Sequence, residues 1–229
     1  MARAVVTGAS SGIGEAIAYK LYELGYTVEG VGRKFSTNVP YNTHICNLEN
    51  SIEIEKLCER LLDEGECDLL INSAGLGYFM PHEELSVTQI TQLLRINLEA
   101  PILLSNLLLR SLKKTGGIII NISSIEAIKT SRHSALYAAS KSGLRHFSLT
   151  LFEEVRKSGV QVVSINPDMT QTPFFDKQRF EPEDSELTRL LPHTIADSVA
   201  YILDLPKGTV VSDLTVRPQK VGIIKKVLK

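Results

Sequence analysis

The sequence predicts an α/β fold in which a doubly wound, mostly parallel sheet carries helices on both faces. Three observations support this class. Short runs rich in β-branched residues alternate with longer helical patterns along the chain. Residues 69–71 and 118–120 are continuously apolar, which is typical of strands buried on both faces. The 229 residues contain no repeat or linker, so we expect one domain over residues 1–229.

The elements follow in turn. A first strand at 4–7 leads into a helix whose apolar residues recur at helical spacing until Gly25. We expect a long helical region at 86–114 to be interrupted near Pro101, because proline lacks a backbone donor. Further strands are expected at 27–31, 44–46, 68–72, 117–123, 160–166 and 209–217. Further helices are expected at 51–63, 136–157 and 195–205. This order predicts a Rossmann-type three-layer sandwich, whose ligands bind beyond the carboxyl ends of the strands.

Charge and composition argue against several function classes. The net charge is −1 and no block of like charge occurs, so we expect no nucleic-acid partner and no membrane partner. No apolar run approaches the ~20 residues that span a bilayer, and the first residues lack the layout of a signal peptide. The three cysteines lack metal-ligand spacing. We therefore expect free thiols in a cytoplasmic protein and no metal site.

A glycine-rich turn follows the first strand, with the sequence TGASSGIG from Thr7 to Gly14. Gly8, Gly12 and Gly14 permit a tight turn and a close approach of the backbone to phosphate. The free N–H groups of the next helix would bind a pyrophosphate. The residues predicted to contact the cofactor that carries this pyrophosphate are Gly8, Ser10, Ser11, Gly12, Ile13 and Gly14. The alternative is a structural turn without a ligand.

The end of the second strand predicts the choice of cofactor. An acidic residue at this position holds the ribose hydroxyls in NAD-binding versions of the fold. Here Gly32 is followed by Arg33 and Lys34, and a guanidinium binds a 2′-phosphate well. We therefore expect NADP(H) as the preferred cofactor, with NAD(H) as the other candidate. A solvated basic loop is the alternative interpretation.

Tyr137 and Lys141 lie four residues apart on a predicted helix and so share one face. A nearby ammonium group lowers the pKa of a phenol, and we expect this effect to bring Tyr137 within reach of proton transfer. Ser123 and Ser124 close a predicted strand at the ligand-binding edge of the sheet. A hydroxyl there can hydrogen-bond a substrate carbonyl.

Taken together, these motifs resemble the short-chain dehydrogenase/reductase family over nearly the whole chain. The matching segments, in the family's order, are TGASSGIG, Asn72-Ser73-Ala74-Gly75, Asn97, Ser124 and the run Tyr137 to Lys141. The resemblance implies that Tyr137 donates or accepts the proton, and that Lys141 lowers its pKa and holds the nicotinamide ribose. It also implies that Ser124 orients the substrate oxygen and that Asn97 supports a proton-relaying water. The separation of serine and tyrosine selects Ser124 over Ser123.

The same resemblance implies further cofactor contacts. Asn47 would contact adenine, and Asn72 and Gly75 would line the adenosine side. The full additional set is Asn47, Leu48, Asn72, Ala74, Gly75, Tyr137, Lys141, Pro167, Thr170 and Thr172. Asp168 stands where the family has a glycine, and Ser73 stands where it has an asparagine. The resemblance therefore does not predict the geometry of the loops at these two positions.

We therefore expect hydride transfer between NADP(H) and a carbonyl or secondary alcohol. The alternative is a catalytically idle NADP-binding module that regulates partners. Residues 173–192 occupy the place of the family's substrate lid. Glu126 is favoured as a solvated turn residue, with binding of a substrate amine or hydroxyl as the alternative. The apolar helical stretches at 90–112 and 136–155 predict a homodimer or homotetramer, without deciding between them.

Overall fold

Parallel strands form the central sheet, and their order along it is β3-β2-β1-β4-β5-β6-β8. The computed structural model describes residues 1–35 and 38–226. The strands of the sheet are β1 (Arg3–Thr7), β2 (Thr27–Gly32), β3 (Asn42–Ile45), β4 (Leu69–Asn72), β5 (Ile118–Ile122), β6 (Gln161–Pro167) and β8 (Asp213–Val216). The chain reverses its winding between β1 and β4, so the ends of these two strands flank the switch point where ligands bind. The predicted fold class is confirmed.

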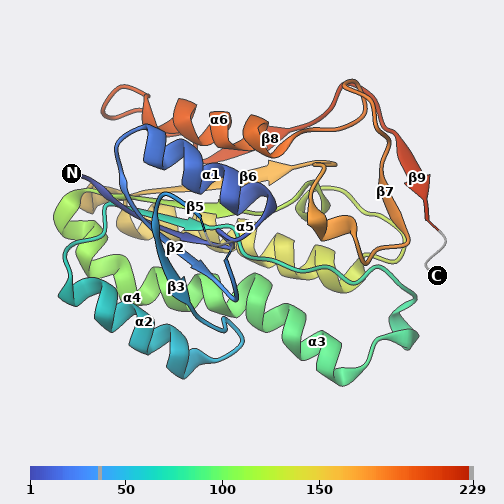
Figure 1. Cartoon of the computed structure of the whole chain (residues 1–229), viewed down its shortest axis with the longest axis horizontal. Coiled ribbons are helices and arrows are strands. Elements are labelled where there is room, and N and C mark those ends of the chain that lie inside the picture. Colours follow the sequence, from blue (N-terminus) through green and yellow to red (C-terminus); the bar gives the residue numbers. More distant parts are fainter. Residues whose placement is uncertain (36–37, 227–229) are drawn as a thin grey trace.

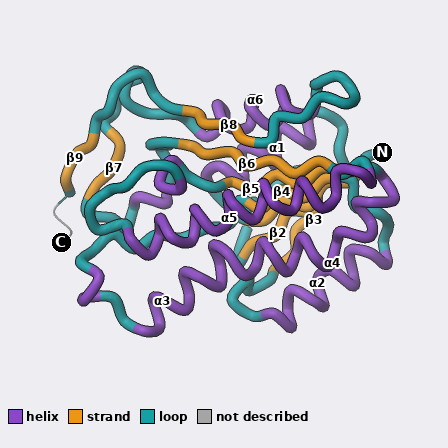
Figure 2. Tube along the Cα trace, turned by 180° about the vertical axis from the view of Figure 1, so that it is seen from behind, coloured by secondary structure: helices purple, strands orange, loops and turns teal. Residues whose placement is uncertain are grey.

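Two helical layers cover the sheet (Figures 1 and 2). On one face lie α1 (Gly12–Glu23) and α6 (Pro192–Leu203), which pack against each other. On the other face lie α2 (Ser51–Asp63), α4 (Ala100–Thr115) and α5 (Ala135–Val155), with α3 (Val87–Leu94) leading into α4. Each layer buries its own apolar core against the sheet because the strands present apolar side chains to both faces. Two of these strands are the continuously apolar β4 and β5.

The long helical region is interrupted just before Pro101. A π-helical turn, η2 (Arg95–Glu99), joins α3 to α4, and Pro101 lies in the first turn of α4. Proline is tolerated there because the first helical turn does not need its N–H. The wider turn places Asn97 in the buried interior. Such π-turns occur frequently at functional sites.

Several elements differ from the sequence-based expectation. The third strand is Asn42–Ile45 instead of 44–46, and the last strand of the sheet is only Asp213–Val216. A separate antiparallel pair, β7 (Phe180–Pro182) and β9 (Ile223–Lys225), was not predicted. Both figures place this pair at one end of the molecule, away from the N-terminus. In the described part of the chain, no helix combines the length and apolar character needed to cross a membrane.

Candidate active site

The glycine-rich turn has the backbone conformation that its glycines permit. Gly8 and Gly12 have φ values of 70° and 60°, in the left-handed region that disfavours side chains. A Cβ at Gly14 would overlap the carbonyl oxygen of Gly8. Ser11 is the N-cap of α1, and its side chain makes no capping hydrogen bond. The first N–H groups of α1 therefore border a cradle of bare backbone, which suits a pyrophosphate.

The turn is fastened to the end of β4. The hydroxyl of Thr7 accepts hydrogen bonds from the amides of Ser73 and Ala74, at 3.1 and 3.2 Å. A Cβ at Gly8 would lie 2.9 Å from the Ala74 backbone, so glycine is needed for this close approach. The Asn72 side chain is directed elsewhere: its amide donates to Asn121 Oδ1 at 2.8 Å. Asn72 therefore supports the sheet and does not line the cavity described below.

Arg33 and Lys34 follow β2 and are exposed. Neither forms an ion pair within residues 1–35 and 38–226. A Cβ at Gly32 would lie 3.1 Å from the Ser10 side chain and 3.1 Å from the Phe35 ring, so the backbone here is closely packed. Two uncompensated cations thus lie at the strand end where the adenosine ribose binds in this fold.

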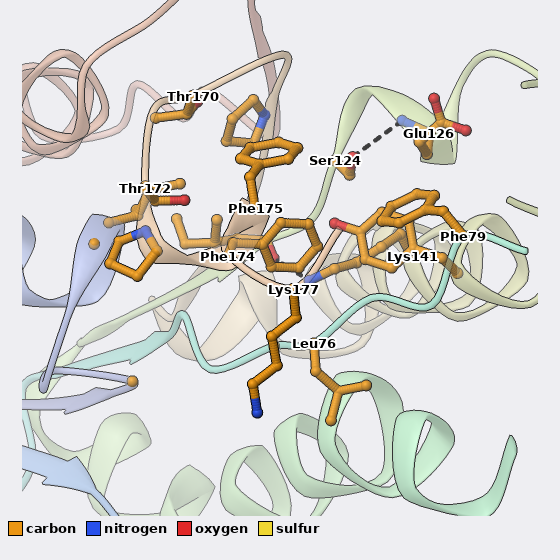
Figure 3. Close-up of a pocket in the computed structure, with 18 of the residues that line it drawn as sticks. Leu76, Phe79, Ser124, Glu126, Lys141, Thr170, Thr172, Phe174, Phe175 and Lys177 are labelled. Atoms are coloured by element: carbon orange, nitrogen blue, oxygen red, sulfur yellow. Dashed lines mark hydrogen bonds between the residues drawn. The ribbon is translucent and has the colours of Figure 1, made fainter. Parts of the chain in front are cut away.

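The candidate catalytic residues converge on the end of β5. Ser124 accepts a hydrogen bond from the Glu126 amide at 3.1 Å (Figure 3). Ser124 and Tyr137 both line the cavity described below. The Ser123 hydroxyl instead donates to the Lys141 carbonyl at 2.9 Å. The geometry therefore favours Ser124 as the serine that meets a substrate oxygen.

Burial dominates the ionisation of the tyrosine–lysine pair. Burial raises the pKa of Tyr137 to about 12; the Ser124 hydroxyl opposes this rise, and the charge of Glu126 adds to it. Burial also lowers the pKa of Lys141 to about 8. The lysine ammonium donates to the Ile122 carbonyl at 2.9 Å and lies 6.0 Å from the centroid of the tyrosine ring. The expected lowering of the Tyr137 pKa is therefore not produced by the chain's own groups, because desolvation outweighs the opposing effect of Ser124.

Asn97 uses its side chain to hold the loop after β4. Its amide donates to the Leu76 carbonyl at 2.8 Å, and its oxygen accepts from the Leu76 amide at 2.9 Å. The same amide donates to Ser140 on α5 at 3.2 Å. Asn97 lies behind the cavity wall. A Cβ at Gly75 would lie 3.4 Å from Lys141 Nζ and 3.5 Å from Asn97 Oδ1, so these groups are close neighbours.

One cavity of about 1060 Å³ connects the glycine-rich turn with Ser124, Tyr137 and Lys141. All predicted site residues line it except Asn72 and Asn97. Those that do are Gly8, Ser10, Ser11, Gly12, Ile13, Gly14, Arg33, Lys34, Asn47, Leu48, Ala74, Gly75, Ser124, Tyr137, Lys141, Pro167, Thr170 and Thr172. The cradle, the free helix N-terminus and the two cations fit a nicotinamide dinucleotide.

The cavity also contains residues that the sequence did not single out. They come from residues 173–192 and from the C-terminal segment, and include Lys177, Arg179, Phe180, Val221, Ile223 and Lys225. No local signal marks them, because pairing of β7 with β9 brings the two segments together. Phe79 and Phe174 pack near Tyr137, with ring centroids 5.1 and 5.8 Å from its ring.

Two acidic residues beside the site have defined surroundings. The Glu126 side chain is only 12% exposed and its Oε1 accepts from the Ser131 hydroxyl at 2.7 Å. The expectation of a solvated turn residue is therefore wrong, since the loop folds over this carboxylate. Asp168 is buried and its Oδ2 accepts from Arg217 Nε at 3.0 Å. This ion pair ties the end of β6 to the segment after β8 and explains how an aspartate fits in place of a glycine.

Comparison with known proteins agrees with this geometry. The family model for short chain dehydrogenases matches residues 2–183. An uncharacterized oxidoreductase of Staphylococcus epidermidis is 32% identical over 225 residues, covering 94% of this chain and 96% of the relative.

Two solved structures share the fold. The alcohol dehydrogenase from the archaeon Thermococcus sibiricus, complexed with 5-hydroxy-NADP, has a TM-score of 0.86 and 28% identity, covering 95% of this chain and 97% of that one. A 4-hydroxyisoleucine dehydrogenase complexed with NADH has a TM-score of 0.84 and 26% identity, with the same coverage of 95% and 97%. Because the family model matches most of this chain, the chain belongs to the short-chain dehydrogenase family of oxidoreductases.

Proposed function

We propose that this protein transfers a hydride between NADP(H) and a carbonyl or secondary alcohol substrate. The observation that carries the proposal is that Ser124, Tyr137 and Lys141 line the same cavity as the glycine-rich turn. Relatives support a nicotinamide dinucleotide, since the Thermococcus sibiricus structure holds 5-hydroxy-NADP and the 4-hydroxyisoleucine dehydrogenase holds NADH. The preference for NADP rests on Arg33 and Lys34.

The bound dinucleotide supplies or accepts the hydride, and the chain handles the proton. Ser124 orients the substrate oxygen, and Tyr137 donates a proton to it during reduction. With a pKa of about 12, the phenol stays protonated at neutral pH and is ready to donate. Lys141 holds the nicotinamide ribose and, while protonated, favours the phenolate that donation leaves behind.

Asn97 is proposed to act by position, because its side chain fixes the Leu76 backbone beside Lys141. Residues 173–192 are proposed to close over the substrate, since Phe174 and Phe175 line the cavity. The cytoplasmic location stays a prediction.

The test is NADPH oxidation with a panel of diketones, oxo acids, aldehydes and quinones, together with the reverse reaction on alcohols. The wild type should turn over at least one class. Tyr137→Phe removes only the transferable proton, so it should lose nearly all turnover while binding NADPH in calorimetry as the wild type does. Retention of more than a few per cent of the activity would refute the role of Tyr137. NADPH binding without turnover of any carbonyl or alcohol would refute the enzymatic function.

A further inference from the structure

We infer that the substrate is an oxo or hydroxy acid with an apolar body, whose carboxylate is bound by Arg179, directly before β7, and Lys225 on β9. The inference rests on the proposed carbonyl chemistry at Ser124 and Tyr137. It concerns the opposite end of the substrate, to which no sequence motif assigns a residue.

The β7–β9 sheet forms one wall of the cavity. Its strands are antiparallel, with Phe180 opposite Lys225 and Pro182 opposite Ile223. Directly opposite residues project from the same face of such a pair. Phe180, Ile223 and Lys225 all line the cavity, so this face is turned toward it.

The C-terminal strand is fastened to the segment that contains Phe175 and Arg179. The Lys226 amide donates to the Arg179 carbonyl at 2.8 Å, and the Lys226 ammonium donates to the Phe175 carbonyl at 2.7 Å. The Lys226 side chain also pairs with Glu181 at 3.2 Å. Lys226 is therefore used in holding the wall together, whereas Arg179 and Lys225 line the cavity.

The cavity has excess positive charge away from the glycine-rich turn. Its acidic residues there are Glu84, Glu126 and Asp168. Asp168 is paired with Arg217 at 3.0 Å and lies 3.8 Å from Lys129, which is also 3.9 Å from Glu126. Four further cations line the cavity without an ion-pair partner among the described residues: Arg132, Lys177, Arg179 and Lys225. Unpaired cations at the mouth of a binding site favour an anionic ligand, and arginine suits a planar carboxylate.

An aromatic surface connects the catalytic hydroxyl with this charged wall. The Phe79 ring lies 5.1 Å from the Tyr137 ring and 5.1 Å from the Phe180 ring, measured between centroids. Phe175 continues the surface, 5.6 Å from Phe180. A ligand with its carbonyl at Tyr137 would cross apolar surface before reaching Lys225. The matching ligand has an apolar body between a carbonyl and a carboxylate.

The cofactor's phosphates do not account for these cations. Arg33 and Lys34 already stand at the end of β2, where the adenosine part binds in this fold. Arg179 and Lys225 instead flank Phe180, in the aromatic surface that reaches Tyr137. The two pairs of cations therefore serve different parts of the cavity, and their substitution should affect different kinetic constants.

The experiment compares aryl ketone acids, whose carbonyl and carboxylate lie at opposite ends of a phenyl ring, with their methyl esters, using NADPH oxidation. The wild type should show a kcat/KM at least about tenfold higher for the best acid than for its ester, because the ester lacks the charge. In the double variant Arg179→Gln with Lys225→Gln, this ratio should fall to near one, with the KM for NADPH close to the wild-type value. Lys207→Gln is the control, since Lys207 is exposed on the loop between α6 and β8, at the amino ends of the strands and outside the cavity.

Equal rates for acid and ester in the wild type would overturn the inference. So would a double variant that keeps the ratio, or one that instead raises the KM for NADPH. If no acid or ester is turned over, the proposed reaction fails for these compounds, and calorimetry on the NADP⁺-loaded protein decides the inference separately. Binding of the acid that is tighter than that of the ester and is lost in the double variant supports it, and equal or absent binding of the acid overturns it.

Discussion

Ser124, Tyr137 and Lys141 show how single residues depend on their surroundings. All three are buried, and their two ionisable groups are both shifted toward the uncharged form. The spacing of Tyr137 and Lys141 places them on one face of α5, but it does not determine the direction in which the lysine ammonium points. The ammonium donates to the Ile122 carbonyl, which lies at the end of β5 and 19 residues away in sequence. The proton chemistry is therefore set by contacts between elements.

Arg33 gives the prediction on cofactor choice. A charge-assisted contact with phosphate contributes roughly 1.5–3 kcal/mol, so Arg33→Ala should weaken NADPH binding about ten- to a hundredfold. NADH lacks the 2′-phosphate, so its binding should weaken little. The measurement is kcat/KM for both cofactors, with Arg156→Ala as the control at the other edge of the sheet. An equal loss of kcat/KM for NADPH and NADH would show that Arg33 does not bind the 2′-phosphate.

Gly32 is a poor place to introduce the acidic residue typical of NAD-binding relatives of this fold. A Cβ there would lie 3.1 Å from Ser10 and Phe35, so the neighbours would have to yield by a few tenths of an ångström. Substitution of the exposed Arg33 avoids this packing change. Its effect on cofactor choice is therefore easier to interpret.

The π-helical turn η2 shows how an element positions a site. It brings Asn97 to the Leu76 backbone, where both side-chain polar atoms are used. A regular helix through residues 86–114 would direct this side chain differently, because each residue advances the helix by about 100°. The interruption is therefore part of the site's construction.

Asn97→Ala tests this role of the turn. The change leaves the Leu76 amide and carbonyl without their partner, which should cost about 1–3 kcal/mol in the free energy of unfolding. It should also lower kcat more than it raises the KM for NADPH, since the loop beside Lys141 loses its support. Urea unfolding and steady-state kinetics measure the two effects. Ser140→Ala removes the 3.2 Å contact with Asn97 and the 2.8 Å bond to the Tyr137 carbonyl but keeps both bonds between Asn97 and Leu76, so as the matched control it should have a smaller effect on both. Unchanged kcat in Asn97→Ala would exclude the positioning role.

At the scale of the whole molecule, a buried ionic cluster links the start of the chain to two strands. Arg3 Nε lies 2.8 Å from Glu29 Oε1, and a His44 ring nitrogen lies 2.7 Å from Glu29 Oε2. Burial alone would raise the pKa of Glu29, but the hydrogen bonds from His44 and Arg3 lower it to about 2. The ionised carboxylate therefore stabilises the fold above pH 4.5, its ordinary pKa, and this contribution is lost as the pH falls toward 2.

The prediction is a difference in acid stability. The fall in pKa from 4.5 to about 2 corresponds to roughly 3 kcal/mol in the free energy of unfolding. Glu29→Gln should be less stable than the wild type at neutral pH, and the gap should narrow between pH 4.5 and 2. Urea unfolding across this range measures it, with the exposed Glu154→Gln as the control. A gap that is constant with pH would show that the charge of Glu29 is unimportant.

Assembly is the second prediction for the whole molecule. Leu103, Leu107 and Phe147 on α4 and α5 are only partly buried, although they pack against the core. We expect a second copy to cover these helices in a homodimer or homotetramer. Sedimentation equilibrium or light scattering at micromolar concentration gives the mass. Leu107→Glu should shift the mass toward the monomer, whereas Tyr201→Glu on α6 should not. A monomeric wild type would contradict the expectation.

The sequence by itself determined the layers and the reacting groups. Apolar runs such as β5 predict a sheet covered on both faces, because only such a sheet buries both sides of a strand. The glycine-rich turn, Ser124, Tyr137 and Lys141 were recognisable because their residue types and spacing are dictated by local backbone geometry and chemistry.

Only the tertiary structure decided the rest. The direction of the shift in the Tyr137 pKa depends on burial, and the burial of Glu126 depends on how its loop folds. The β7–β9 wall joins segments about 40 residues apart through a strand pairing that no local sequence pattern predicts. The chain therefore encodes its cofactor turn and catalytic groups locally, while the substrate wall exists only after distant segments have packed together.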